Sequence, residues 1–566
     1  MASLPDETRP DGSSRYDAIV VGAGFAGLYM LHRLRTQGFT VRLFERADGV
    51  GGTWWWNRYP GARCDVESLA YSYSFDEALQ QEWTWTERYA PQAEILAYLD
   101  HVADRFGLRG DIVLGTSVVA ARYDEDVAMW SVETERADGS GAGPAATAPV
   151  LIMATGCLSA ASVPPIPGLE SFTGDRYHTA AWPHEGVDFT GRRVAVIGTG
   201  SSAIQSIPLI AAEAEHLYVL QRTPSFTIPG HNGPLDAAVL HHTREHYGEY
   251  RARIRNSFTH IPDMTRDVSA ANVSPDERRD ILEEVWAEGG LRMAWVFPDL
   301  LTNPESNEIV AAFVREKIRG FVEDPAVAAT LTPTTYPIAS KRLCVDTGYY
   351  ETFNRPNVTL VDLTETPVVE IVAEGIRTEA ATLPVDAIVF ATGFDAMTGS
   401  LLRVDIRGRG GLRLSEKWAD GPVTYLGLAV SGFPNLFTVT GPGSPSVLTN
   451  MVPTIEQHVE WIADCVRYLR DHDLVAIEAD AADEREWTSL VDLIAGATLM
   501  PRANSWYMGR NIEGKPQGFM PWAGGAPAYR QIADSVAADG YRGFTLTPAE
   551  RISPVGRRGF VGGAAG

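Results

Sequence analysis

Cysteine is scarce in this sequence of 566 residues. The four cysteines, Cys64, Cys157, Cys344 and Cys465, lie far apart and form no C-x-x-C pair. This spacing argues against a disulfide scaffold, a structural zinc site and dithiol redox chemistry. We therefore expect a reducing, cytoplasmic setting and predict no metal site.

Long apolar runs and an excess of basic residues are also missing. No apolar run approaches the roughly 20 residues of a membrane span, and residues 1–16 lack the apolar core of a signal peptide. The chain has 48 basic against 72 acidic residues, which gives a net charge of −24. Such a surface repels nucleic-acid phosphates and anionic lipid heads, so neither is an expected partner. An anionic cofactor must then be held by local donors.

What the sequence does contain is typical of a folded protein with several domains. Hydrophobic residues make up 45% and charged residues 21%, and the length suffices for two to four domains. Two segments combine a buried strand, a glycine turn and an apolar helix, which is typical of parallel sheets. Between residues 236 and 328 strand signals give way to charged helical patterns, which predicts a helical insertion.

The first glycine turn has the G-x-G-x-x-G spacing at Gly22, Gly24 and Gly27. The first glycine permits the turn, the second lets the backbone approach a pyrophosphate, and the third lets helix and strand touch. The next strand ends in Glu45, 18 positions after Gly27 (45 − 27), where an acid can accept hydrogen bonds from a ribose. The N-terminal position of this unit suits FAD.

The second glycine turn, Gly198-Thr-Gly200, precedes a strand that ends in Arg222 and Thr223 rather than in an acid. An acid would repel the 2′-phosphate of NADPH, whereas arginine and threonine can bind it. We therefore predict NADPH, with an exposed salt-bridging arginine as the alternative interpretation of Arg222. One flavin and one nicotinamide imply hydride transfer from NADPH to FAD.

The predicted fold is α/β, with two Rossmann-like dinucleotide-binding domains for FAD and NADPH and a helical insertion in the NADPH domain. The predicted parts, in chain order, are the FAD domain (1–157), the NADPH domain (158–225), the insertion (226–335), the rest of the NADPH domain (336–391), the rest of the FAD domain (392–550) and a flexible tail (551–566).

Further motifs lie between and after the two turns. Residues 172–183 have Phe172, Gly174, His178, Trp182 and Pro183 in the spacing F-x-G-x-x-x-H-x-x-x-W-P. The others are G-G-T-W-W-W-N-R-Y-P-G-A-R-C-D at 51–65, Lys-Arg with Y-Y-E-T-F-N between 341 and 354, and the loop at 441–451. Together they resemble the Baeyer–Villiger monooxygenases, most closely the branch that takes phenylacetone, steroids and large cyclic ketones. The resemblance runs from about residue 17 to about residue 547.

The resemblance implies a reaction between O2 and a ketone. In that family NADPH reduces FAD, the reduced flavin captures O2 as a C4a-peroxide anion, and the anion attacks the ketone to give an ester or lactone. This chemistry needs a fixed positive charge in a dry pocket, and arginine suits because it stays protonated. By resemblance that residue is Arg342, held by Asp65 through a charge-assisted pair. Outside the motif, a structural arginine and a turn residue would be the ordinary interpretations.

The predicted catalytic residues are thus Arg342 and Asp65, and a larger set is expected to contact the two cofactors. That set comprises Gly22, Gly24, Phe25, Gly27, Glu45, Thr53, Trp54, Trp55, Trp56, Arg63, Cys64, Asp65, Tyr71, Val118, Gly198, Thr199, Gly200, Ser201, Ser202, Gln205, Arg222, Thr223, Lys341, Arg342, Met451 and Trp506. Core packing is the alternative for Met451 and Trp506. At least one of the consecutive tryptophans serves packing, because three in a row cannot all face one way on a strand.

Four alternatives complete the prediction. His178 is expected to couple the domains rather than act as an acid or base. The H-x-x-E-H pattern at 242–246 is interpreted as a solvated helix face rather than a zinc site. A flavin-containing monooxygenase acting on nitrogen or sulfur is the alternative function, and a redox-sensing flavoprotein is a more distant one. Trp182-Pro183 and Lys341-Arg342 favour a ketone substrate. The sequence does not decide the oligomeric state, and a monomer is compatible with it.

Overall fold

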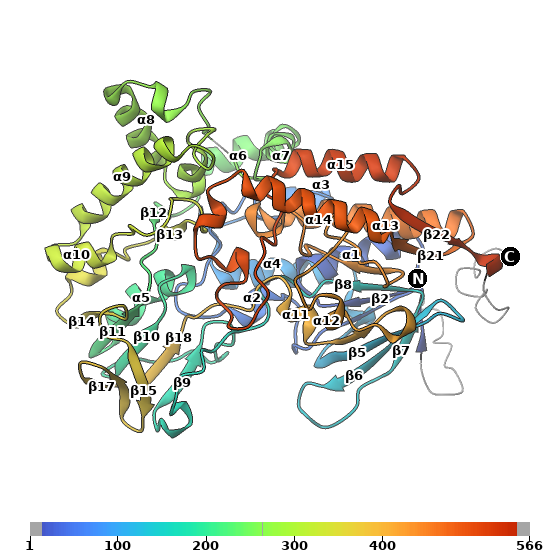
Figure 1. Cartoon of the computed structure of the whole chain (residues 1–566), viewed down its shortest axis with the longest axis horizontal. Coiled ribbons are helices and arrows are strands. Elements are labelled where there is room, and N and C mark those ends of the chain that lie inside the picture. Colours follow the sequence, from blue (N-terminus) through green and yellow to red (C-terminus); the bar gives the residue numbers. More distant parts are fainter. Residues whose placement is uncertain (1–13, 263, 552–566) are drawn as a thin grey trace.

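The computed structural model describes residues 14–262 and 264–551. It has the predicted α/β fold, with two parallel sheets that lie in different lobes of the molecule (Figure 1). No helix in this described part is long and apolar enough to cross a membrane. Apart from residue 551, the predicted tail lies outside the described residues.

The first lobe is built on a parallel sheet of five strands. In sheet order these are β20 (Leu436–Thr438), β8 (Val150–Met153), β2 (Ala18–Val21), β3 (Val41–Phe44) and β4 (Ile112–Val113). The residues of β20, β8 and β2 are all buried, which is why these strands are continuous apolar runs rather than alternating ones. Helix α1 (Phe25–Thr36) contacts β2 and β3 and packs against α13 (Met451–Asp471).

The second lobe repeats this architecture. In sheet order its parallel strands are β14 (Val358–Asp362), β11 (His216–Gln221), β10 (Arg193–Ile197), β18 (Ala387–Phe390) and β9 (Asp175–His178). Helix α5 (Ser201–Glu213) follows β10 and packs on β10 and β11. Each lobe therefore places a helix N-terminus directly after a glycine turn at the end of a central strand.

Further sheets complete the molecule. One joins the first lobe through a shared apolar cluster and has the order β1 (Ser14–Arg15), β7 (Ala146–Ala148), β6 (Met129–Arg136), β5 (Thr116–Asp124) and β19 (Asp405–Arg407). The others are β15 (Val368–Val372) with β16 (Gly375–Thr378) and β17 (Thr382–Pro384), β12 (Thr227–Pro229) with β13 (Cys344–Asp346), and β21 (Leu474–Ala479) with β22 (Phe544–Pro548).

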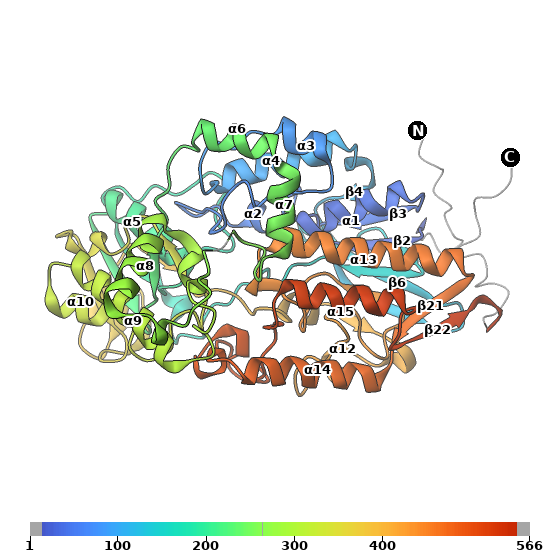
Figure 2. The ribbon, with the colours of Figure 1, turned by 90° about the horizontal axis from the view of Figure 1, so that it is seen from above.

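The stretch from 236 to 331 folds into helices. These are α6 (Ala237–Glu245), α7 (Tyr247–Asn256), α8 (Pro275–Glu288), α9 (Pro304–Phe321) and α10 (Pro325–Leu331). Helices α8, α9 and α10 each begin with a proline behind a side-chain cap, which accounts for where they start. Figure 2 shows α7 lying against α15 (Ala526–Ala538) and α13, so this insertion contacts the first lobe as well.

The remaining α-helices are α2 (Thr53–Trp56), α3 (Glu77–Glu82), α4 (Gln92–Arg105), α11 (Gly399–Leu402), α12 (Leu414–Lys417) and α14 (Ala481–Gly496). The three tryptophans therefore lie on one helical turn, α2, and not on a strand. After residue 392 the chain returns to the first lobe through β19, β20 and α13. The domain boundaries drawn from the sequence stay a prediction.

Candidate active site between the two lobes

The first glycine turn joins β2 to α1 and has no room for a side chain at two of its three glycines. Gly22 has a φ of +104°, and a Cβ there would lie 2.6 Å from the carbonyl oxygen of Ala154. A Cβ on Gly27 would lie 1.8 Å from the carbonyl oxygen of Gly22, and one on Gly24 would lie 3.4 Å from Gly52 Cα. The backbone at the start of α1 is therefore bare, which fits a bound pyrophosphate.

Glu45 lies beside this turn, just after β3, and it is buried. Its Oε2 accepts a hydrogen bond from Ala23 N–H at 2.7 Å, and its Oε1 accepts one from Ala47 N–H at 2.8 Å. Burial raises the pKa of Glu45, although both N–H groups oppose the rise. The backbone N–H of Thr116, two residues before Val118 on β5, donates to the Glu45 carbonyl at 2.8 Å. The first two contacts fix the carboxyl group at the edge of the turn, and the third fixes the backbone of Glu45 beside β5.

Aromatic side chains form the next part of the site. The rings of Phe25 and Tyr71 lie edge to face with centroids 5.3 Å apart, and Trp54 Nε1–H donates to the Tyr71 hydroxyl at 3.3 Å. Trp54 is buried, whereas Trp55 and Trp56 are half-buried and each stacks against an arginine. Of the three tryptophans, Trp54 is the one that packs into this group.

The second glycine turn, between β10 and α5, is more open. Gly198 has a φ of +112°, and a Cβ there would lie 2.5 Å from the carbonyl oxygen of Ala391. At Gly200 a Cβ would meet nothing within 4 Å. Thr199 Oγ1 donates to the Thr223 carbonyl at 2.9 Å, which fixes the residues after β11 beside the turn. This geometry leaves the start of α5, with Ser201 and Ser202, accessible to an anion.

Two cations flank this second turn. Arg222 is exposed and has no ion-pair partner in the described part of the chain. Lys341 is half-buried, and its ammonium lies 4.3 Å from the centre of the Tyr336 ring. Burial lowers the pKa of Lys341, and the positive charge of Arg222 lowers it further. Two like charges that repel one another across an open turn favour an anionic ligand.

Gln205 on α5 joins the second lobe to the first. Its Oε1 accepts a hydrogen bond from the Tyr59 hydroxyl at 2.8 Å, and its Nε2 donates to the Arg63 carbonyl at 3.1 Å. Between these two residues, a Cβ on Gly61 would lie 2.5 Å from the carbonyl oxygen of Gln205. This close approach brings Asp65, the last residue of the motif at 51–65, toward the second lobe.

Asp65 and Arg342, 277 positions apart, form a two-pronged ion pair. Arg342 Nε–H donates to Asp65 Oδ2 at 2.9 Å, and its Nη2 donates to Oδ1 at 2.8 Å. Its Nη1 donates to the carbonyl oxygen of Val447 at 3.1 Å. Burial opposes the charge, but Asp65 raises the pKa of Arg342 above its usual range, so the guanidinium stays charged.

Weakly acidic groups surround this pair. Burial raises the pKa of Cys64 and of Tyr507, and it raises the pKa of Cys344 to about 11. These groups are neutral near pH 7. Sequence reasoning missed the Val447 carbonyl, because a backbone acceptor leaves no mark in residue type. It also passed over Tyr507, which follows Trp506 in the chain.

The other predicted residues lie around this centre or tie its parts together. Trp506 is half-buried with its ring 4.4 Å from that of Tyr507, and half-buried Met451 begins α13 four positions after Val447. Thr53 is exposed at the start of α2. His178 Nε2 lies 3.3 Å from the Ser162 carbonyl, and burial lowers its pKa. In residues 14–262 and 264–551, no group of His, Cys, Asp and Glu could hold a metal.

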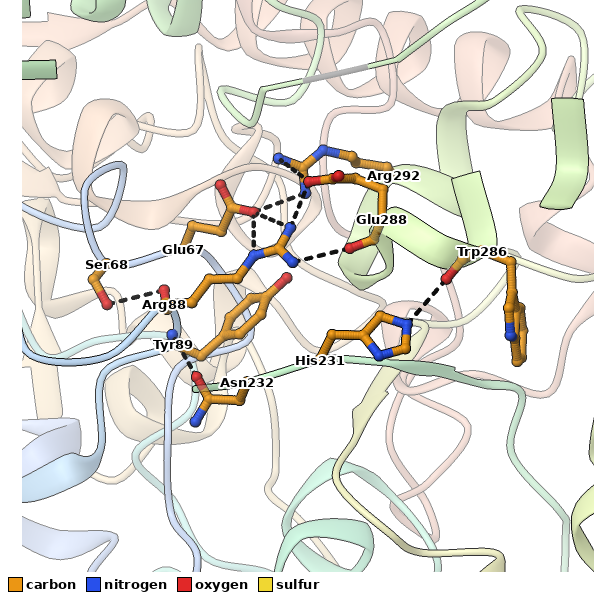
Figure 3. Close-up of polar contacts among 9 residues, drawn as sticks. All are labelled: Glu67, Ser68, Arg88, Tyr89, His231, Asn232, Trp286, Glu288 and Arg292. Atoms are coloured by element: carbon orange, nitrogen blue, oxygen red, sulfur yellow. Dashed lines mark hydrogen bonds and ion pairs between the residues drawn. The ribbon is translucent and has the colours of Figure 1, made fainter. Parts of the chain in front are cut away.

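A second charged cluster lies two residues after Asp65 (Figure 3). Glu67 Oε1 accepts hydrogen bonds from Arg88 Nε and Nη2 at 3.0 and 2.7 Å, and from Arg292 Nη1 at 2.8 Å. Arg88 also donates to the carboxylate of Glu288 at 2.8 Å. The backbone N–H of Tyr89 donates to Asn232 Oδ1 at 2.9 Å. The cluster therefore fastens the helical insertion to the first lobe.

Comparison with known proteins agrees with this geometry. The chain is 40% identical over 530 residues to a Baeyer–Villiger monooxygenase from Pseudooceanicola batsensis, covering 93% of this chain and 95% of the relative. A solved structure of an oxidized steroid monooxygenase bound to NADP has 53% identity and a TM-score of 0.89, with 94% and 99% of the two chains covered. This chain belongs to the Baeyer–Villiger monooxygenases. Residues 16–241 also match the flavin-binding monooxygenase-like family model.

One further relative bears on the alternative function. The monooxygenase is 41% identical over 537 residues to the phenazine N-monooxygenase PhzNO1 of Lysobacter antibioticus, with 94% and 97% of the two chains covered. The fold of the present chain, its flavin and nicotinamide cofactors and its enzyme class are those predicted from its sequence.

Proposed function

We propose that this monooxygenase converts a ketone to an ester or lactone at the Asp65–Arg342 pair. The balanced reaction consumes the ketone, O2, NADPH and a proton, and it yields the ester, water and NADP+. The observation that supports this proposal is the fixation of Arg342. Of its five N–H donors, three are used by Asp65 and Val447, which leaves two for the site.

The bare glycine turns fit the two dinucleotides. FAD would be held by residues of the first lobe: Gly22, Gly24, Phe25, Gly27, Glu45, Thr53, Trp54, Trp55, Trp56, Arg63, Cys64, Asp65, Tyr71, Val118 and Met451. NADPH would be held by residues of the second lobe and its rim: Gly198, Thr199, Gly200, Ser201, Ser202, Gln205, Arg222, Thr223, Lys341, Arg342 and Trp506. Bound FAD, reduced by NADPH, would activate O2 so that one of its oxygen atoms can be transferred to the ketone.

Arg342 contributes a charge that does not change during the reaction. Because Asp65 grips its Nε and Nη2, the guanidinium plane cannot turn, and its remaining N–H groups keep one direction. A preorganised donor of this kind stabilises negative charge that develops on a substrate oxygen. The neutral neighbours Cys64 and Tyr507 add no competing negative charge.

Large cyclic or steroidal ketones are the proposed substrates, with aryl ketones next. The steroid monooxygenase likeness, at 53% identity, supports this class, and the family resemblance of the loop at 441–451 agrees. The cytoplasm is the proposed location.

Oxidation of nitrogen or sulfur is the second candidate, and the phenazine N-monooxygenase relative is the finding that favours it. An N-oxide forms without migration of a carbon–carbon bond, so the product distinguishes the two. This candidate explains the cofactor sites equally well, but it gives the Asp65–Arg342 pair no special role.

The deciding experiment supplies purified enzyme with NADPH, 18O2 and a panel of a 20-keto steroid, a macrocyclic ketone, phenylacetone, a phenazine and a sulfide. A labelled ester or lactone from a ketone supports the proposal. A labelled N-oxide or sulfoxide with no ester supports the second candidate. Consumption of NADPH with hydrogen peroxide as the only product would contradict both.

A further inference from the structure

The loop that carries Val447 is held in a strained backbone conformation. Thr440 and Ser446 are not glycine, yet they have φ values of +56° and +41°. Each such residue costs about 1–3 kcal/mol and persists only where its surroundings fix it. Ser446 Oγ donates to the Thr440 carbonyl at 3.2 Å, which closes the loop on itself. Contacts from outside the loop must supply the rest.

His458 holds one end of this loop. The backbone N–H of Thr440 donates to His458 Nδ1 at 3.0 Å, and His458 is fully buried. Burial and the charge of Arg530 lower the pKa of His458 to about 3, so the ring is neutral. A neutral imidazole has one donor and one acceptor nitrogen, and here Nδ1 must be the acceptor. A protonated ring could not accept this bond.

His260 of the insertion holds the other end through two threonines. Thr449 Oγ1 gives its only hydrogen to the Ser446 carbonyl at 2.9 Å. It must then accept from Thr454 Oγ1 at 2.7 Å, and Thr454 in turn accepts from His260 Nδ1 at 3.2 Å. Burial, Arg530 and Arg255 lower the pKa of His260 to about 3. With the Thr449 hydrogen on the Ser446 carbonyl, the relay runs from a neutral His260 at Nδ1 through Thr454 to Thr449.

The same part of the insertion contacts the loop through its backbone. Asn450 N–H donates to the Thr259 carbonyl at 2.8 Å, and Asn450 Nδ2 donates to the Ala70 carbonyl at 2.7 Å. His260 has a φ of +56° and is fully buried. Asn450 of the loop thus hydrogen-bonds both to Thr259 of the insertion and to Ala70, which lies in the segment that begins at Asp65.

We propose that His260 and His458 are positioning residues that fix the loop so that the Val447 carbonyl holds Arg342 in place. The inference rests on the proposed role of Arg342. The relay from His260 ends on the Ser446 carbonyl, and the next carbonyl along the chain is the one that accepts from Arg342 Nη1. The helical insertion in this way contributes to the site without touching substrate, and the two histidines act through hydrogen bonds rather than through charge.

The test breaks the relay at Thr454 with a side chain of nearly the same shape as threonine. Thr454→Val removes the hydroxyl, and Thr454→Ser retains it. Thr332→Val is the matched control, because Thr332 is equally buried and its hydroxyl makes one hydrogen bond, at 2.7 Å, far from the loop in sequence. His260→Leu and His260→Asn form a second pair, in which the asparagine amide can replace the Nδ1 donor. Because leucine also disfavours the positive φ of His260, the Thr454 pair decides between the outcomes. Two quantities are measured: amide hydrogen exchange of residues 440–451, and the ratio of ester to hydrogen peroxide per NADPH.

We expect Thr454→Val and His260→Leu to speed exchange in the loop and to lower the ester-to-peroxide ratio about tenfold, the equivalent of one lost buried hydrogen bond. Thr454→Ser, His260→Asn and Thr332→Val should stay near wild type in both, with the rate of flavin reduction by NADPH unchanged throughout. Unchanged loop exchange in Thr454→Val would overturn the relay. Faster exchange with an unchanged product ratio would overturn its effect on Arg342. If the wild type forms no ester, the proposed function fails, and the exchange data still decide the relay.

Discussion

Two arginine–carboxylate contacts lie two residues apart in the chain and are built differently. Asp65 uses both oxygens on one arginine, Arg342, and together with the Val447 carbonyl it leaves two N–H groups of that arginine free. Glu67 uses a single oxygen to accept from two arginines, Arg88 and Arg292. The first arrangement prevents rotation of a guanidinium that keeps donors to spare. The second neutralises charge where segments of the chain meet, as Figure 3 shows.

Burial and ion pairing alone therefore do not identify a catalytic arginine. The side chain of Arg292 is 10% exposed and that of Arg342 is 22% exposed, so the structural arginine is the more buried one. What separates them is the hold on the guanidinium, since Asp65 binds Arg342 through two of its nitrogens whereas Glu67 binds Arg292 through one, and the position of Arg342 between the two glycine turns. Substitutions at Arg342 should change the yield of ester, whereas substitutions at the Glu67 cluster should change the free energy of unfolding.

The largest effect is expected from Arg342→Ala. Loss of the fixed donors should lower ester formation at least about 100-fold, because one preorganised donor contributes about that much in other enzymes. FAD content should stay close to that of wild type, and saturating NADPH should still reduce the flavin in the absence of O2. Product analysis by mass spectrometry and stopped-flow absorbance measure these quantities. Normal ester formation by this variant would remove Arg342 from the mechanism.

Arg292→Met should have the opposite profile. Glu67 would keep Arg88 but lose a buried charge-assisted partner, so the free energy of unfolding should fall by about 2 kcal/mol. The ratio of ester to peroxide should not change. Urea denaturation and the same product assay give both numbers. A product ratio that falls as far as in Arg342→Ala would mean that the two contacts are not separable.

The sequence predicts the Asp65–Arg342 pair and the glycine turns, but it does not predict the Glu67 cluster. Gly22 and Gly198 could be found because their turns leave a fixed spacing, and the Asp65–Arg342 contact was expected from the family resemblance of motifs 277 positions apart. The Glu67 cluster leaves no such mark, since single charged residues without a motif usually face solvent. The Val447 carbonyl and the His260 relay depend on how the insertion docks on the first lobe. That docking is tertiary packing, which residue type and spacing do not encode.

Arg222→Ala tests an arginine that has no carboxylate partner among the described residues. Because Arg222 is exposed and without an ion pair among the described residues, its removal should cost little stability. Loss of a charge-assisted bond to the 2′-phosphate should lower the preference for NADPH over NADH about tenfold in kcat/KM. Arg319→Ala, an exposed arginine on α9, is the control. An unaltered coenzyme preference would place Arg222 among ordinary surface arginines.

The smallest effect is expected in the pH dependence of stability. Burial alone would raise the pKa of Glu67, but Arg292 and Arg88 outweigh it and the net pKa is lowered. A carboxyl whose folded-state pKa lies below its unfolded value stabilises the protein above about pH 4.5, and that stabilisation is lost as the pH falls through the folded-state value. Glu67→Gln has no such proton to bind, so its free energy of unfolding should fall less than that of wild type between pH 6 and pH 4. Glu316→Gln is the control for an exposed carboxylate paired with an arginine. Equal slopes in wild type and Glu67→Gln would show that the Glu67 cluster stabilises the interface by packing rather than by charge.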